Sequence, residues 1–286
     1  MALHWPTFFT RLGSAIVFSA IMMVGLLWNQ WAFLVLISLI TSFCLFEFFR
    51  MLKKVYHDSE WPNFLMPATI IYALILIWLP PISAALQGLP PNIAHQKFLP
   101  PLMVGLPLIL LTTILPKKTA LRAGVFAMAA LGYIAAPALM LYSMRLQSLL
   151  LPLALVLLIW MNDTMAYLVG SFIGRTPFSS ISPKKTWEGT TGGALLTMGL
   201  AIVWGWKSQL FQIEDWIVLA LCASVAGTAG DLLESKLKRI AHVKDSGKIM
   251  PGHGGALDRF DSLLIAVPFA FCYSWLYVEA LNIKVF

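Results

Sequence analysis

The chain has 286 residues, of which 59% are hydrophobic and only 12% are charged, with a formal net charge of +7. Soluble globular domains carry about 25% charged residues, and the mean hydropathy of +0.80 points the same way. This composition excludes a soluble enzyme, a disordered tail and a secreted disulfide scaffold. It predicts an all-α polytopic membrane protein.

Nine largely uncharged runs predict membrane-spanning helices along the chain. In order, they cover residues 12–28, 31–49, 64–87, 98–116, 121–144, 148–172, 190–206, 215–233 and 262–281. Three acidic residues within these runs are notable: Glu47 near the end of the second, Asp163 within the sixth, and Asp231 at the end of the eighth. Together the runs predict a single integral membrane domain over residues 1–286.

The basic residues between the runs predict the orientation. With the N-terminus in the cytoplasm and nine alternating spans, sixteen of the twenty Lys and Arg residues fall on the cytoplasmic side. This bias is typical of membrane proteins, and it predicts contact with anionic membrane lipids rather than with nucleic acid. The loops 173–189 and 234–261 then lie on the same cytoplasmic side, where a soluble substrate can reach both.

Three aspartates mark the ends of the last two runs. Asp231 closes the eighth run, and Asp258 and Asp261 precede the ninth. If Asp258 and Asp261 lie on a helical turn, their i, i+3 spacing places them on one face. Hard carboxylate oxygens suit Mg²⁺, which takes one or two carboxylates together with water and substrate phosphates. We therefore expect Asp231, Asp258 and Asp261 to bind a metal ion.

Groups suited to phosphate surround these aspartates. Six cations lie from Lys236 to Arg259, and Lys and Arg are the usual ligands of phosphate oxygens. Gly254 and Gly255 follow His253 just before the ninth run, where backbone N–H groups and a helix N-terminus can meet an anion. Each Lys taken alone is equally compatible with a solvated loop on anionic lipid. The glycines are also compatible with a flexible turn.

A polar pair interrupts the sixth run. Asn162 and Asp163 follow an apolar stretch, and helical rise places Asp163 roughly 10 Å from the cytoplasmic end. Burying an aspartate in a membrane costs at least about 2.5 kcal/mol. We therefore expect Asp163 to face a cavity or a partner, although an interhelical hydrogen bond is an alternative.

The next loop concentrates polar side chains in the segment from Ser182 to Gly189. Its sequence is Ser-Pro-Lys-Lys-Thr-Trp-Glu-Gly. Its Ser, Lys, Thr and Glu can bind a nucleotide or complete a metal shell. The same segment is equally compatible with a turn at headgroup level, anchored by Trp187.

The run from Ser235 to Asp261 resembles the signature of the phosphatidate cytidylyltransferases, also called CDP-diacylglycerol synthases. The residues that carry the resemblance are Ser235, Lys238, Arg239, Lys244, Asp245, Gly247, Pro251, His253, Gly254, Gly255, Asp258, Arg259 and Asp261. The segment Ser182–Gly189 and the pair Asn162-Asp163 also resemble features of that family.

The resemblance implies that CTP reacts with phosphatidate to give CDP-diacylglycerol and pyrophosphate, with Mg²⁺ required and a monovalent cation such as K⁺ assisting. It assigns metal ligation to the three aspartates, and it implies an active site that faces the cytoplasm. We expect a bacterial inner membrane, because no organelle transit segment is visible. The resemblance implies phosphate contacts for Lys238, Arg239, Lys244, His253 and Arg259, and places Gly254, Gly255, Asn162, Asp163, Ser182, Lys185, Thr186 and Glu188 around the substrates.

Two other functions are weighed against this interpretation. A secondary transporter would place polar groups near the midplane on several helices, whereas here they gather near one face. A polyprenol or lipid kinase would share the metal chemistry, but there is no Walker-type Gly-Lys-Ser/Thr loop. Small-residue patches such as Gly192-Gly193 and Ala226-Gly227 can pack helices within a chain or in a homodimer.

Overall fold

The structure of the protein is a computed structural model. It describes residues 5–56, 63–88, 118–208, 211–249 and 254–278. Within these residues the regular structure is helical, apart from an isolated antiparallel bridge between Pro177 and Thr186. Six helical runs in this part are long and apolar enough to span a membrane: Gln30–Val55, Leu65–Gln87, Gly124–Gln147, Leu150–Ile173, Ile213–Ile240 and Leu257–Tyr277. The chain is therefore a polytopic α-helical membrane protein.

Two further predicted spans coincide with helices that do not meet this measure of length and hydropathy. The helix α1 (Trp5–Leu27) holds a shorter apolar segment, Gly13–Leu27, and α9 (Trp187–Ser208) covers the seventh predicted run. The predicted span 98–116 lies outside the described residues.

The helices form two compact units. The first comprises Met1–Leu146 and Ile240–Arg259, and the second comprises Gln147–Arg239 and Phe260–Phe286. The single membrane domain expected from the sequence stays a prediction.

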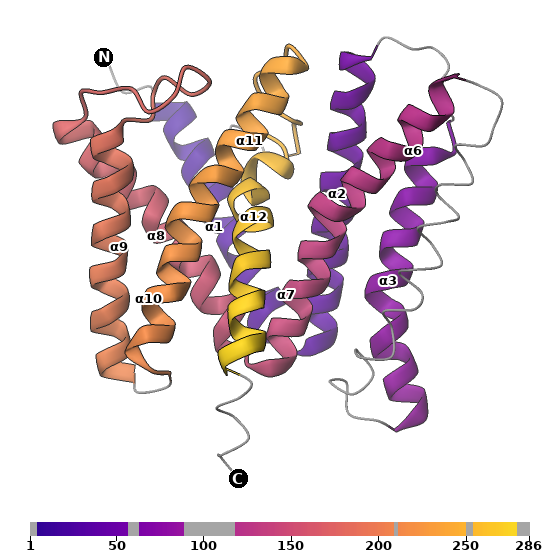
Figure 1. The fold of residues 1–286 in the computed structure, drawn as a ribbon, viewed down its shortest axis with the longest axis horizontal. Helices are drawn as coiled ribbons and strands as arrows, with labels where there is room; N and C mark the ends of the chain where they lie inside the picture. Colours follow the sequence, from indigo (N-terminus) through magenta and orange to yellow (C-terminus); the bar gives the residue numbers. More distant parts are fainter. Residues whose placement is uncertain (1–4, 57–62, 89–117, 209–210, 250–253, 279–286) are drawn as a thin grey trace. The chain divides into compact units, whose positions relative to one another are not determined.

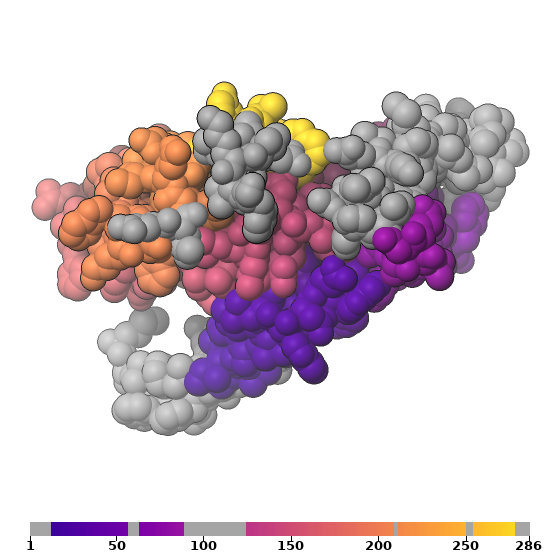
Figure 2. Space-filling model, turned by 90° about the horizontal axis from the view of Figure 1, so that it is seen from below, coloured from indigo at the N-terminus to yellow at the C-terminus, as the bar shows by residue number. Residues whose placement is uncertain are grey.

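In the first unit, α2 is the central element. It packs against α1 and α3, with α1 and α2 at the indigo end of the colour scale (Figures 1 and 2). The indole of Trp78 on α3 donates a hydrogen bond of 2.8 Å to the Ser38 hydroxyl on α2. The helices of this unit are α1, α2 (Gln30–Val55), α3 (Leu65–Gln87), α6 (Lys118–Ala130), the π-helical turn η2 (Leu131–Ala135) and α7 (Ala136–Gln147).

In the second unit, α8 and α9 lie side by side (Figure 1). Small residues permit this close approach, because a Cβ at Gly193 would lie 2.7 Å from Ala166, and one at Gly189 would lie 2.9 Å from the Cα of Gly170. The small-residue patch at Gly192-Gly193 thus packs helices within the chain. The other helices of this unit are α8 (Leu150–Ile173), α10 (Ile213–Leu221), the π-helical turn η3 (Cys222–Ala226), α11 (Gly227–Ile240), most of α12 (Leu257–Tyr273) and the π-helical turn η4 (Ser274–Val278).

Both predicted loops are shorter in the structure. Residues 234–240 continue α11 and Leu257 already begins α12, so 241–256 connect the helices, and α9 likewise begins at Trp187. The prediction ended each span where charges appear. Charged side chains end an apolar run, but they leave the backbone hydrogen bonds of a helix intact.

Candidate active site

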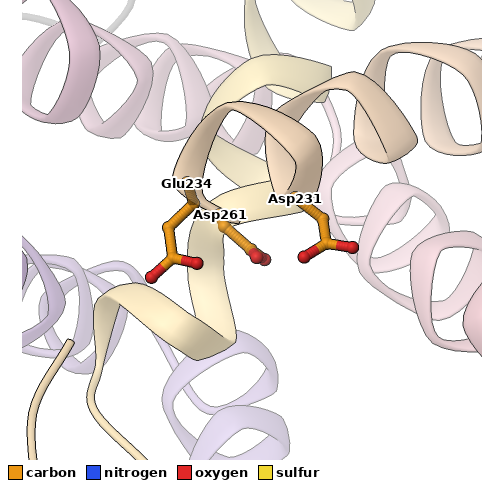
Figure 3. Close-up of side chains that lie close together, drawn as sticks. All are labelled: Asp231, Glu234 and Asp261. Atoms are coloured by element: carbon orange, nitrogen blue, oxygen red, sulfur yellow. The ribbon is translucent and has the colours of Figure 1, made fainter. Parts of the chain in front are cut away.

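Three carboxylates converge in the second unit. Asp231 and Glu234 come from α11 and Asp261 from α12, and one oxygen of each lies within 4.8 Å of the others. Figure 3 shows the three side chains pointing to the same side, with Asp261 between the other two. Glu234 is 0% exposed and Asp261 is 7% exposed, whereas Asp231 is half-buried. We call these three residues the acidic cluster.

Helix geometry and one glycine bring the acidic cluster together. Asp231 and Glu234 are three residues apart and share a face of α11. A Cβ at Gly230 would lie 2.3 Å from the backbone oxygen of Asp261, so a glycine is needed where the start of α12 crosses α11. The sequence predicts that Asp231, Asp258 and Asp261 lie together at the ends of the last two helices, and the acidic cluster contains Asp231 and Asp261 of these three.

Two lysines reach the acidic cluster. Lys238 forms an ion pair with Glu234 one turn away on α11, and Lys185 forms an ion pair with Asp231 from the connection between α8 and α9. Two like charges at the outer limit of 4.8 Å repel by about 3.5 kcal/mol at an effective dielectric of 20. Three carboxylates with two cations leave an excess of negative charge among hard oxygen donors. Such a donor set fits a divalent cation such as Mg²⁺.

The connection that carries Lys185 is a short, hydrogen-bonded turn. The N–H of Phe178 donates to the carbonyl of Lys185 at 2.7 Å, and the N–H of Trp187 donates to the carbonyl of Thr176 at 2.9 Å. The Thr186 hydroxyl accepts a hydrogen bond of 3.1 Å from the N–H of Gly189, which caps the start of α9. Backbone bonds on both sides therefore fix the position from which Lys185 reaches Asp231.

Glu188 anchors this same turn. Its carboxylate accepts hydrogen bonds from the Thr176 hydroxyl at 2.8 Å and from the N–H groups of Thr176 and Arg175 at 3.1 Å. The Thr176 hydroxyl, together with these backbone donors, lowers the pKa of Glu188 to about 2. At neutral pH the carboxylate is therefore ionised, and its hydrogen bonds tie the start of α9 to residues 175 and 176. Ser182 lies in the turn as well, and its carbonyl accepts the N–H of Lys185 at 3.1 Å.

In the first unit, Asp258 is surrounded by donors of its own segment. One carboxylate oxygen accepts hydrogen bonds from the Ser246 N–H at 2.9 Å, the Ser246 hydroxyl at 3.0 Å and the Gly255 N–H at 2.7 Å. Gly254 has a φ of +85°, and a Cβ there would lie 2.5 Å from the same Asp258 oxygen. The N–H of Gly255 is thus committed to Asp258 in this structure. Asp258 is not a member of the acidic cluster, and its metal ligation stays a prediction.

The remaining predicted site residues fall into three groups. Arg239, Lys244 and Arg259 are exposed, as a side chain that meets a soluble ligand must be. Asn162 is buried, and its side-chain oxygen has no hydrogen-bond partner among the described residues, whereas Asp163 is exposed on α8. His253 lies outside the described residues.

Comparison with known proteins identifies the family. The profile described as "Cytidylyltransferase family" matches residues 9–277. The chain belongs to the cytidylyltransferase family. It is 47% identical over 115 residues to a phosphatidate cytidylyltransferase of Bacillus subtilis, a match that covers 40% of this chain and 43% of the relative. It is 36% identical over 171 residues to a phosphatidate cytidylyltransferase of Staphylococcus saprophyticus, which covers 58% of this chain and 65% of the relative.

A third relative, a phosphatidate cytidylyltransferase of Synechocystis, is 42% identical over 127 residues, with 43% of each protein covered. The chain thus spans about half the length of the curated relatives that it matches. The family resemblance predicted from residues 235–261 is confirmed by these matches.

Two buried carboxylates, Glu234 and Glu47, are not among the site residues predicted from the sequence. Glu234 lies just beyond the predicted helix, which ends at residue 233, although it follows Asp231 by three residues. Glu47 stands out in the sequence only as a charge inside the second run. A signal for Glu234 exists, since the i, i+3 spacing on an extended α11 would have placed it beside Asp231.

Proposed function

We propose that this protein transfers the cytidylyl group of CTP to phosphatidate, giving CDP-diacylglycerol and pyrophosphate. The observation that carries the proposal is the acidic cluster of Asp231, Glu234 and Asp261 with its two lysines, on helices of a membrane protein of the cytidylyltransferase family. Relatives that carry the name phosphatidate cytidylyltransferase support the choice of substrates.

We propose Mg²⁺ as the cation of the acidic cluster, with a monovalent cation such as K⁺ assisting. Carboxylates whose oxygens lie within 4.8 Å of one another offer the hard, negatively charged donors that Mg²⁺ prefers. When bound, the ion would supply charge neutralisation for the phosphates of the substrates. Asp231 and Asp261, our predicted ligands, would hold it together with Glu234. Asp258 is kept as a predicted third aspartate.

The reaction needs little acid–base chemistry from the protein. The phosphate of phosphatidate is already an anion near neutral pH, and one of its oxygens attacks the α-phosphorus of CTP. The bond from that phosphorus to the oxygen that bridges to the β-phosphate breaks, and pyrophosphate leaves with the electron pair. The task of the side chains is to hold two anions in line and to offset their charge.

The basic residues near the acidic cluster fit this task. Lys185 and Lys238 already pair with its carboxylates, and an arriving phosphate can share their N–H donors. Arg239 follows Lys238 at the exposed end of α11, where its planar fork can bind two phosphate oxygens at once. We assign pyrophosphate and phosphatidate contacts to these three side chains, and to Lys244, His253 and Arg259 in the segment that follows.

We further propose the topology predicted from the sequence. It has nine spans, the N-terminus in the cytoplasm and the active site at the cytoplasmic face of a bacterial inner membrane. The distribution of Lys and Arg residues supports this orientation. A homodimer in the membrane is part of the same proposal.

The test uses protein purified in detergent with phosphatidate, Mg²⁺ and each of CTP, ATP, GTP and UTP in turn. Pyrophosphate release and the mass of the lipid product are followed together. We expect CDP-diacylglycerol and one pyrophosphate per product with CTP alone. A phosphorylated lipid formed from ATP without pyrophosphate would overturn the proposal in favour of a lipid kinase. If the protein in proteoliposomes instead moves a solute across the membrane without altering it, a transporter is favoured.

A further inference from the structure

A buried carboxylate in the first unit has no role in the chemistry proposed above. Glu47 lies near the cytoplasmic end predicted for α2 and is 1% exposed. One of its oxygens accepts the N–H of Ala256 at 3.1 Å, and the other accepts the N–H of Leu257 at 2.9 Å and the hydroxyl of Ser246 at 2.7 Å. A side chain of α2 therefore caps the first amides of α12, about 210 residues later in the chain.

The segment before α12 is shaped around this carboxylate. A Cβ at Gly247 would lie 1.8 Å from one oxygen of Glu47, and a Cβ at Gly255 would lie 2.3 Å from the other. Any larger residue at either position would displace Glu47 or open the segment. The two glycines of the family signature are thus needed here for close packing on Glu47, in addition to any contact with a ligand.

One hydroxyl connects Glu47 to Asp258. The Ser246 oxygen lies 2.7 Å from a Glu47 oxygen and 3.0 Å from an Asp258 oxygen, and it accepts the N–H of Asp258 at 3.3 Å. A hydroxyl has a single proton to donate, so the two carboxylates share it. The orientation of Ser246, and through it that of Asp258, depends on Glu47.

We propose that Glu47 is a positioning residue: it holds Ser246 and the first amides of α12 so that Asp258 keeps one orientation for cytidylyl transfer. The inference rests on the proposed function. Glu47 itself touches no reacting atom. A carboxylate suits this position because it can accept from N–H groups with both oxygens, which no neutral side chain of the same size can do.

The test variant is Glu47→Gln. The amide keeps the size of the side chain but offers one oxygen, so in either orientation one N–H of Ala256 or Leu257 faces an NH₂ group. We expect kcat for CDP-diacylglycerol formation to fall by about 10- to 100-fold, the usual effect of losing an outer-shell partner. KM for phosphatidate should stay close to the wild-type value, because Glu47 does not contact the substrate.

The matched control is Asp215→Asn. Asp215 is another buried carboxylate that caps a helix: it accepts the N–H of Gln212 at 2.9 Å and the hydroxyl of Tyr273 at 2.6 Å. The same chemical change there should lower Tm and leave kcat unaltered. Ser246→Ala should lower kcat as well, and the double variant with Glu47→Gln should be no slower than the slower single variant, because both act through one hydroxyl.

The outcomes separate this inference from the proposed function. A wild type that forms no CDP-diacylglycerol overturns both. An active wild type, with Glu47→Gln at the wild-type kcat or with effects of the two substitutions that multiply, overturns the positioning role alone. Should Glu47→Gln fail to fold, Ser246→Ala decides: a reduced kcat at unchanged KM supports the inference, and a wild-type kcat overturns it.

Discussion

The carboxylates Glu47 and Asp258 of the first unit and the acidic cluster of the second are held in opposite ways. In the first, Glu47 and Asp258 accept hydrogen bonds from backbone N–H groups and from the Ser246 hydroxyl. In the second, the carboxylates of the acidic cluster face one another and are reached by two lysines. A carboxylate saturated by N–H donors is stable without a cation, whereas converging carboxylates repel until a cation joins them. Carboxylates of the first kind fix the local backbone, whereas carboxylates of the second kind are suited to bind a cation.

The largest effect should come from Asp261→Asn. Removing one carboxylate of the acidic cluster should lower kcat by about 10³-fold, because the cluster would hold its Mg²⁺ less firmly and that ion would offset the charge of the transition state. In the absence of divalent cation the variant should unfold at the same temperature as the wild type or higher, because a like-charge repulsion is relieved. Thermal unfolding in detergent, with and without Mg²⁺, checks this.

Glu47→Gln provides the contrast for that measurement, since it should lower Tm whether or not Mg²⁺ is present. Mg²⁺ should raise the Tm of the wild type, as any ligand of the folded state does, and should not raise that of Asp261→Asn. If both variants shift Tm in the same direction, the distinction between the two kinds of carboxylate is wrong.

The next effect tests the close approach of the two helices in the second unit. Gly230→Ala adds a Cβ that would lie 2.3 Å from the backbone oxygen of Asp261, so α12 must move away from α11. A shift of about 1 Å in a catalytic group can cost about 10²-fold in rate. We expect a loss of that order in kcat. Gly199→Ala on α9 is the control, because a Cβ there meets nothing within 4 Å; equal activity of the two variants would show that the approach is not needed.

The sequence predicts the class of protein and names two of the three carboxylates of the acidic cluster. Apolar runs gave the helices, because membrane burial requires about 20 apolar residues in a row. Asp231, Asp258 and Asp261 are expected together, because all three lie at the ends of the last two runs, and the acidic cluster contains Asp231 and Asp261 of these. Glu234 was missed because the run ended one residue earlier, and a hydropathy pattern does not register a helix that continues with polar side chains.

Glu47 could not have been found in the same way. Its donors, the amides at the start of α12, lie about 210 residues away, and no local periodicity encodes such a pairing. Asp258 illustrates the same limit. Its spacing to Asp261 is correct for one helical face, but the spacing does not show that Ser246 and Gly255 donate to its carboxylate. Sequence patterns give the elements, whereas the partners of a buried carboxylate depend on tertiary packing.

A smaller effect should follow from Lys185→Met, which keeps most of the length of the side chain and removes its charge. The ion pair with Asp231 is lost, and with it a cation that offsets the acidic cluster and the proposed substrate phosphates. We expect about a 10-fold loss in kcat/KM for CTP, with binding of Mg²⁺ slightly tighter because the lysine no longer competes with it. Lys184→Met is the control, since Lys184 is the exposed neighbour in the same turn. An equal loss in both variants would point to the turn rather than to the charge.

The smallest effect concerns Glu188, a carboxylate of the saturated kind in the second unit. Its pKa of about 2 lies below the ordinary value of 4.5, so the stability it contributes is fully present above pH 4.5 and is lost as the pH falls towards 2. Thr176→Val removes the hydroxyl, the largest cause of the lowered pKa, and should raise the titration midpoint. Carbon NMR of glutamate labelled at the carboxyl carbon measures that midpoint.

Thr164→Val serves as the control, because the Thr164 hydroxyl donates to the carbonyl of Trp160. An unchanged midpoint in Thr176→Val would mean that the Arg175 and Thr176 N–H groups hold the carboxylate by themselves, and that the turn carrying Lys185 depends on backbone donors alone.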